Sequence, residues 1–127
     1  MTAKEAMTVK EVADTLVKLC SQGKFEEAGE KLYSPEILSI EPGAPPGQSR
    51  ESKGIAAVRA KGEWWVNNHE IHSSTVEGPL IAGSYFSVAF KIDVTHKPDK
   101  KRFQLDEIAV YKVVNGKIVR EEFFYAM

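Results

Sequence analysis

The sequence has almost no cysteine and no long apolar run. Cys20 is the only cysteine among 127 residues, which excludes an internal disulfide and a metal cluster held by cysteines. The N-terminal segment MTAKEAMTVKEV lacks the apolar stretch of a signal peptide, and no other segment has the length and hydrophobicity of a membrane span. We therefore expect a cytoplasmic protein with no membrane partner.

Net charge is also close to zero. The chain holds 17 Lys and Arg residues against 18 Asp and Glu residues, a formal net charge of −1 at pH 7. No broad positive field would attract nucleic acid, so none is expected as a partner. No serine lies in a strand–turn–helix elbow and no glycine-rich loop could hold a phosphate, so neither a serine nucleophile nor a nucleotide cofactor is predicted. The hydrophobic fraction of 43% suits a single domain over residues 1–127 with one core.

Helical spacing dominates the first half of the chain. Apolar residues recur at steps of three and four from Val9 to Cys20, and Gly23 is a natural end for this amphipathic helix. A shorter helix over residues 24–33 completes a helical hairpin. A third helix is predicted over residues 53–69. Its apolar stripe contains Ile55, Val58, Gly62, Trp65, Val66 and His69.

Alternation with a period of two marks strands in the rest of the chain. Residues 36–41 form a short strand with Ser39 and Glu41 on one face. The segment PGAPPGQSRES that follows is too rich in proline and glycine for a regular element, and its last residue, Ser52, can cap the third helix. The remaining strands are predicted at residues 70–78 and 84–96 and in a hairpin over residues 104–125. Because helices precede strands, the predicted fold class is α+β, with a curved antiparallel sheet packed on one face by helices.

The last hairpin carries acids among large apolar residues. Its turn, Asn115-Gly116, favours a tight connection because both residues tolerate a positive φ. A two-residue loop would place Asp106 on the face of Glu121, whereas a three-residue loop with a bulge at the glycine would place Glu107 there. We favour the bulged form, which collects the other charged residues on the outer face. In either form Glu121 shares its face with Val119, Phe123 and Tyr125.

Carboxylates on an apolar inner face would have a raised pKa, because such surroundings disfavour the charged form. A group of this kind can act as a general acid or base near neutral pH. Glu107 and Glu121, on adjacent strands, could share a proton, which suits proton transfer at a carbon next to a carbonyl. The alternative is that each acid is a surface partner of a lysine or an arginine.

Four segments of the sequence are informative together: YSPEILSIEP, GIAAVRAKGEWWVNNHEIH, VEGP and DEIAVYKVVNGKIVREEFFY. With these segments and the order helix, helix, short strand, helix and four long strands, the chain resembles the nuclear transport factor 2-like superfamily and, within it, the SnoaL-like proteins. The resemblance covers nearly the whole chain. The resemblance implies a cone-shaped half-barrel whose sheet wraps the long third helix and leaves a pocket for a small organic molecule. It also implies a homodimer formed through the outer face of the sheet.

The resemblance does not imply one reaction. Members include ketosteroid isomerases, polyketide cyclases, dehydratases, epoxide hydrolases and binding proteins, so the site must carry the functional argument. The catalytic Asp of the ketosteroid isomerases and the His-Asp pair of the polyketide cyclases have no clear match here. Glu121 and Phe123 occupy the places where that pair might lie.

One set of candidate site residues follows. The predicted catalytic groups are Glu121 as base or proton relay, Glu107 as its partner and, as the orienting donor, either His69, near the mouth of the cone, or Tyr125. The predicted ligand-binding residues are Trp65, Tyr125, Phe123, Tyr33 and Glu41. His69 and His72 flank the end of the third helix, but their rings need not converge and no third ligand is evident, so no metal site is predicted. No cofactor is expected either.

Two functions from different classes remain open. The protein could catalyse a cofactor-free isomerisation, cyclisation, dehydration or hydrolysis of a small organic molecule, or it could bind a ligand or a protein without catalysis. Catalysis requires at least two ionisable groups that converge on one cavity, whereas binding needs only a lined pocket. If it is an enzyme, we expect the carboxylates of Glu107 and Glu121 to face one enclosed cavity together with Trp65.

Overall fold

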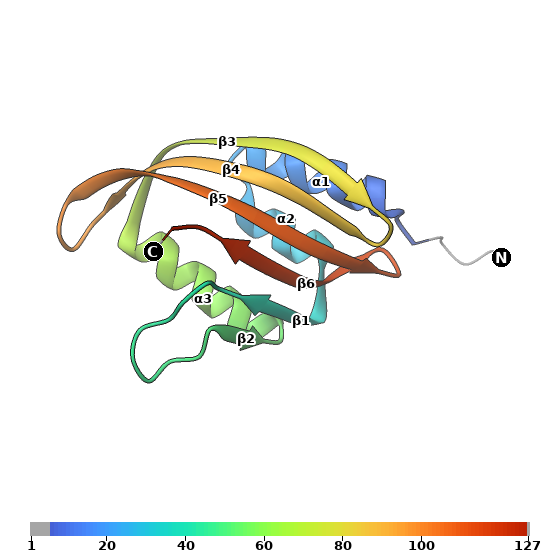
Figure 1. Ribbon diagram of the computed structural model, residues 1–127, viewed down its shortest axis with the longest axis horizontal. Helices are drawn as coiled ribbons and strands as arrows, with labels where there is room; N and C mark the ends of the chain where they lie inside the picture. The colour runs from blue at the N-terminus through green and yellow to red at the C-terminus, as the bar shows by residue number, and fades with distance from the viewer. Residues whose placement is uncertain (1–5, 127) are drawn as a thin grey trace.

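The computed structural model describes residues 6–126, which form three helices and six strands (Figure 1). In chain order the elements are α1 (Val9–Ser21), α2 (Phe25–Leu32), β1 (Tyr33–Ile40), β2 (Glu51–Lys53), α3 (Ile55–Asn68), β3 (His69–Ala82), β4 (Tyr85–His96), β5 (Lys101–Val114) and β6 (Lys117–Phe124). None of these helices has the length and apolar character needed to span a membrane.

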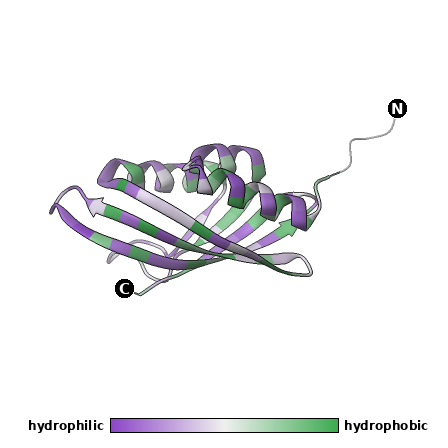
Figure 2. Cartoon of the chain, turned by 90° about the horizontal axis from the view of Figure 1, so that it is seen from above, coloured by the Kyte–Doolittle hydropathy of each residue, from purple (hydrophilic) through white to green (hydrophobic). Residues whose placement is uncertain are grey.

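The strands form one curved, unclosed sheet in the order β2-β1-β6-β5-β4-β3. Neighbouring strands are antiparallel except β1 and β6, which run parallel. The long stretch of chain between these two strands allows the crossover that a parallel pair needs. The helices lie against one face of the sheet (Figure 2). α1 contacts β3 and β4, and α3 contacts β1, β2 and β3. This arrangement confirms the predicted α+β class and the helical hairpin that precedes the sheet.

The first helix begins where the sequence provides a capping box. The Thr8 hydroxyl accepts a hydrogen bond from the Glu11 amide at 3.1 Å, and the Glu11 carboxylate accepts one from the Thr8 amide at 2.9 Å. The apolar stripe of α1 is buried, and it packs on the alternating inner residues of β4. The buried residues of that strand are Phe86, Val88, Phe90, Ile92 and Val94, as the period of two predicts.

The start of α3 differs from the prediction. Residues 51–53 form the edge strand β2, in which Ser52 pairs with Ser39 of β1, so Ser52 does not cap the helix. The residue before the helix is Gly54, with a φ of 86° that other residues rarely adopt. Three residues of weak strand propensity pair here because β1 offers an open edge, which the local sequence does not reveal.

The end of β3 also differs. We predict a stop at Gly78-Pro79, but the strand continues to Ala82, with a register shift between Glu77 and Leu80. β3 lies at the edge of the sheet, so the proline breaks no hydrogen bond to a further strand. A breaker therefore interrupts the pairing here without ending the strand.

Candidate functional site

The register of the β5–β6 hairpin decides which acid faces the interior. Its turn is a two-residue loop, since Val114 pairs with Lys117 across Asn115-Gly116, and Val113 pairs with Ile118. The next pair is Lys112 with Arg120, which leaves Val119 as an extra residue. The predicted three-residue loop is therefore wrong, and the bulge lies three residues after the glycine, at Val119. It nevertheless has the predicted effect, since it places Glu107 and not Asp106 on the face of Glu121.

As a result, Tyr111 pairs with Glu121 and Ala109 with Phe123, so Glu107 shares their inner face. Glu107 is partly buried, whereas Asp106 is exposed. The expectation that Val119 shares the face of Glu121 is wrong, because Val119 is the extra residue of the bulge and has no partner in the register. The fully buried Ile118 takes its place beside Glu121.

Glu121 is a buried carboxylate with a donor on each oxygen. Its side chain is 2% exposed. The Tyr33 hydroxyl donates to Oε1, and the Ser39 hydroxyl donates to Oε2 at 2.7 Å. Burial raises the pKa of Glu121, while the two hydrogen bonds and the nearby Lys61 ammonium oppose that rise. The two hydroxyl groups and the ammonium thus offset part of the cost of a negative charge on Glu121, while burial keeps its pKa above the ordinary value.

The hydrogen bonds continue from Ser39 to a lysine of α3. The Lys61 ammonium donates to the Ser39 hydroxyl and to Glu41 Oε1, the latter at 2.9 Å, and lies 5.3 Å from the centroid of the Phe123 ring. The Tyr125 hydroxyl donates to Glu41 Oε2 at 3.0 Å. We call the connected residues the polar chain: they are Tyr33, Glu121, Ser39, Lys61, Glu41 and Tyr125.

Neighbouring strands explain how the polar chain assembles. Ser39 of β1 is the register partner of Glu121 of β6, and Glu41 follows two residues later on the same face. The two end members of the polar chain also belong to these strands, since Tyr33 begins β1 and Tyr125 follows β6. Only Lys61 belongs to another layer, and it links α3 to the sheet.

Glu107 adds a second carboxylate to this inner face. Burial first, and then the negative charges of Glu41 and Glu121, raise the pKa of Glu107 to about 7, while the Lys61 charge acts in the opposite direction. Unlike Glu121, it is partly open to solvent. A carboxyl group of this kind changes its protonation near neutral pH, as a general acid or base must.

The aromatic candidates divide into two groups. Phe123 and Tyr125 lie with the polar chain, as described above. Trp65 packs against the core and stacks on His69 with ring centroids 4.3 Å apart. His69 Nδ1 lies 2.8 Å from the carbonyl oxygen of Trp65, and its ring also neighbours His96 and Phe103. The structure thus places His69 in an aromatic cluster at the end of α3, away from the hydrogen bonds of the polar chain.

His72 lies outside this aromatic cluster, and its Nε2 is 2.7 Å from the hydroxyl of Thr95 on β4. Within residues 6–126, no group of three or more His, Cys, Asp and Glu side chains is placed to hold a metal ion.

Two members of the polar chain, Lys61 and Ser39, are absent from our candidates. Lys61 lies three residues after Val58 and four before Trp65, so helical spacing alone would place it on their face. We predict a stripe that includes Gly62 and Val66, and both are exposed. The spacing from Val58 and Trp65 could therefore have identified Lys61, but a lysine is rarely expected on the inner face of a helix.

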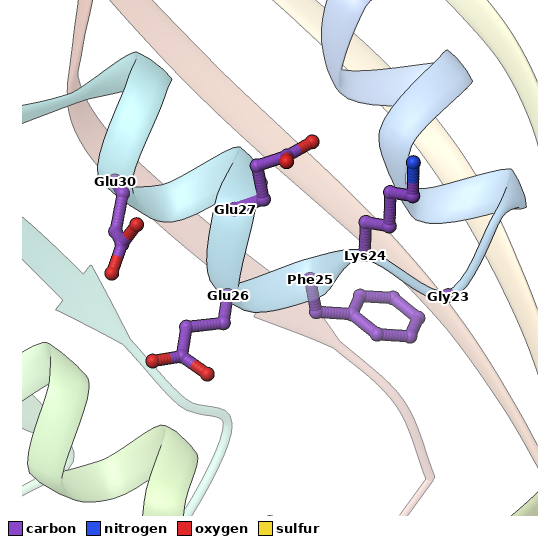
Figure 3. Close-up of a pocket in the computed structure, with 6 residues that line it drawn as sticks. All are labelled: Gly23, Lys24, Phe25, Glu26, Glu27 and Glu30. Carbon is purple, nitrogen blue, oxygen red and sulfur yellow. The ribbon is translucent and has the colours of Figure 1, made fainter.

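Two hollows open on the helical side of the molecule. The larger, about 440 Å³, lies where α1 passes to α2, between Gly23 and Glu30. Figure 3 shows Glu26 and Glu30 directed to one side of α2 and Glu27 to another. The smaller, about 300 Å³, is lined by Tyr33 and by residues of α2, α3 and β6. Neither is lined by Glu107 or Glu121, so the enclosed cavity stays a prediction.

Comparisons with known proteins agree on one family. The profile of the SnoaL-like domain matches residues 7–125. A Mesorhizobium loti protein of known structure, provisionally named a SnoaL-like polyketide cyclase (carbohydrate phosphatase), is 42% identical, with a TM-score of 0.87 over 94% of this chain and 100% of that one. No functionally curated protein matches.

More distant structures share the fold alone. A Bacillus subtilis protein provisionally named an isomerase is 17% identical, with a TM-score of 0.72 over 94% of this chain and 90% of that one. A Catenulispora acidiphila protein with a ketosteroid isomerase-like fold, solved with trimethylamine, is 13% identical, with a TM-score of 0.71 over 94% of this chain and 88% of that one.

Proposed function

This chain belongs to the SnoaL-like family, and on that basis we propose that it is a cofactor-free enzyme that moves a proton on a small, largely apolar organic molecule. The observation that carries the proposal is Glu107, a partly open carboxyl group on the inner face of the sheet with a pKa of about 7. Around it, Phe123 and Tyr125 supply an apolar wall, with Trp65 on the facing helix. The proposed ligand lies between α3 and the sheet, against Glu107, Phe123 and Tyr125.

In the proposed reaction Glu107 is the base. Its carboxylate takes a proton from the carbon between a carbonyl and a neighbouring C=C bond, and the electron pair of the broken C–H bond forms a dienolate. Glu107 then returns the proton to the far carbon of the former C=C bond, so the double bond moves into conjugation with the carbonyl and the net reaction is an isomerisation that needs no cofactor. A pKa near neutral suits both steps, because the group must accept and release the same proton.

Lys61 supplies the positive charge for the enolate oxygen. An ammonium group has three hydrogens, and Lys61 gives two of them to Ser39 and Glu41, which leaves one for a substrate oxygen. Positive charge held where negative charge develops is a large part of catalysis in sites that exclude water. Glu121, whose two oxygens are both occupied, balances the charge of Lys61 through Ser39 and does not itself move a proton.

The name of one relative is consistent with this class of chemistry. The relative that is 42% identical carries the name polyketide cyclase, and a ring closure of a polyketide can begin with the loss of a proton next to a carbonyl.

Proton exchange tests the proposal without knowledge of the natural substrate. The protein is incubated in D₂O at about pH 7.5 with a panel of small cyclic and aromatic ketones, and the loss of each α-proton signal is followed by NMR. We expect faster exchange of at least one ketone with the wild type, and a loss of about a hundredfold or more in Glu107→Gln, since general base catalysis contributes about 10²–10⁴-fold. Asp106→Asn, next to it on the outer face, is the matched control.

Equal exchange by wild type and Glu107→Gln would refute the role of Glu107. A ketone that binds to the inner face without any exchange would favour the alternative function, a non-catalytic ligand-binding module. Protein purified from its native host, with mass spectrometry of any bound molecule, would then identify the ligand.

We also propose that the protein is a homodimer through the outer face of the sheet. Leu80 is 76% exposed and Ile108 52% exposed, and Phe124 lies next to Ile108 in the register. Across the neighbouring strands Lys91 faces Asp106, so acids and bases border the same apolar patch. A second copy rotated by half a turn could match opposite charges around a shared apolar centre.

A further inference from the structure

The smaller hollow has an apolar floor and a charged rim. It measures about 300 Å³ and opens between α2, β1, α3 and the start of β6. The floor is formed by Tyr33, Pro35 and Ile55. At Gly29, also in the lining, an added side-chain carbon would lie only 3.6 Å from the Tyr33 ring, so the absence of a side chain keeps that ring accessible. The volume is at the lower end of the roughly 300–1,000 Å³ of small-molecule sites.

Two cations and one acid form the rim, namely Arg59, Lys117 and Glu30. The Lys117 ammonium is held in place by a hydrogen bond of 2.7 Å to the carbonyl oxygen of Lys31, near the end of α2, and keeps two further hydrogens. The guanidinium of Arg59 has the planar shape that binds a carboxylate through two parallel hydrogen bonds. The rim therefore carries an excess of one positive charge beside an apolar floor.

We propose that this hollow binds a small carboxylate with a flat apolar body. The body lies on the Tyr33 ring and on Pro35, and the carboxylate accepts hydrogen bonds from Arg59 and Lys117. A neutral molecule of the same shape would use the floor but leave the two cations without a partner. A cationic molecule would be repelled by them.

The hollow is distinct from the inner face on which Glu107 lies, yet the two share a residue. The Tyr33 ring lines the hollow, and the Tyr33 hydroxyl donates to Glu121. A carboxylate bound there would touch the residue that holds Glu121 in place. The site is thus positioned to sense a small acid next to the polar chain, whether or not the proposed reaction occurs.

Benzoate and its uncharged counterpart benzyl alcohol test the proposal on the intact protein by NMR titration of the backbone amides. We expect benzoate to shift the Gly29, Ile55 and Lys117 signals saturably, and benzyl alcohol to bind about tenfold more weakly, because a hydrogen bond to a charged group is worth about 1.5–3 kcal/mol. The measurement needs no activity, so its failure would leave the role of Glu107 untouched.

Three charge variants sharpen the result. Arg59→Gln and Lys117→Gln should each weaken benzoate binding about fivefold, and Glu30→Gln should strengthen it, since it removes the only opposing charge of the rim. Lys97→Gln, at the distant β4–β5 turn, controls for net charge and should change nothing. Equal binding of benzoate and benzyl alcohol, an equal loss in Lys97→Gln, or no saturable shift would each overturn the proposal.

Discussion

The pKa of Glu107 makes a quantitative prediction about stability. Below about pH 4.5 the carboxyl group is protonated in both the folded and the unfolded chain. Between 4.5 and about 7 the folded chain keeps the proton while the unfolded chain releases it, so the free energy of unfolding falls as pH rises. Above about 7 both states are ionised and the folded protein carries the full cost of a charge on the inner face.

The size of the effect follows from the two pKa values. A rise from 4.5 to about 7 corresponds to about 2.5 kcal/mol of lost stability between about pH 5 and pH 8. Because Glu107 is partly open to solvent, we expect about 2 kcal/mol. That is a large share of the roughly 5–15 kcal/mol that holds a typical domain together.

Urea denaturation of wild type and Glu107→Gln at about pH 5 and pH 8 measures this contribution. The variant should gain about 2 kcal/mol relative to wild type over that interval, because it has no proton to lose. Asp106→Asn, on the exposed face of the same strand, should follow the wild type. The ¹³C signal of the Glu107 carboxyl should titrate with a midpoint of about 7. Parallel stability curves, or a midpoint near 4.5, would refute the reasoning.

Three further predictions concern the polar chain and the outer face. Tyr33→Phe leaves one oxygen of Glu121 without its donor and should cost about 1–3 kcal/mol in urea denaturation; an unchanged midpoint would mean that this hydrogen bond is unimportant. Lys61→Met keeps the apolar stem but removes the charge that lowers the pKa of Glu107, so the NMR midpoint of Glu107 should move above its wild-type value, and a downward shift would contradict the assignment. Ile108→Glu places a charge in the proposed dimer contact and should give a folded monomer in sedimentation analysis, whereas an unchanged sedimentation coefficient would refute that contact.

Strongly periodic segments were predictable from sequence. The buried alternation of β4 and the apolar stripe of α1 agree with the prediction, because each buries a whole face and a shift of one residue would expose it. The weak stripe of α3 was misplaced, since Gly62 and Val66 fit the pattern as well as Lys61 does. In α3 the inner face is decided by how the helix packs on the neighbouring strands, and not by the pattern of the helix itself.

The sequence predicted which acids lie in the candidate site, but it did not predict the strand register that brings them together. Glu121 was expected on the inner face and is buried there, and the choice of Glu107 over Asp106 agrees with the observed pairing. The bulge that makes this choice lies at Val119, where nothing in the local sequence marks it. Turn chemistry at Asn115-Gly116 fixes the loop, but the register beyond it depends on which side chains the core accepts.

By itself, the sequence determined the α+β class, the helical hairpin and the presence of acids within the last two strands, because periodicity and residue type act locally. Only the tertiary structure decided that β1 lies parallel to β6, which places Ser39 beside Glu121, and that Lys61 of α3 reaches Ser39. Those contacts join residues more than twenty positions apart, and a local pattern cannot specify them. The electrostatics of the site follow from that pairing, since a carboxylate acquires a perturbed pKa from its neighbours in space.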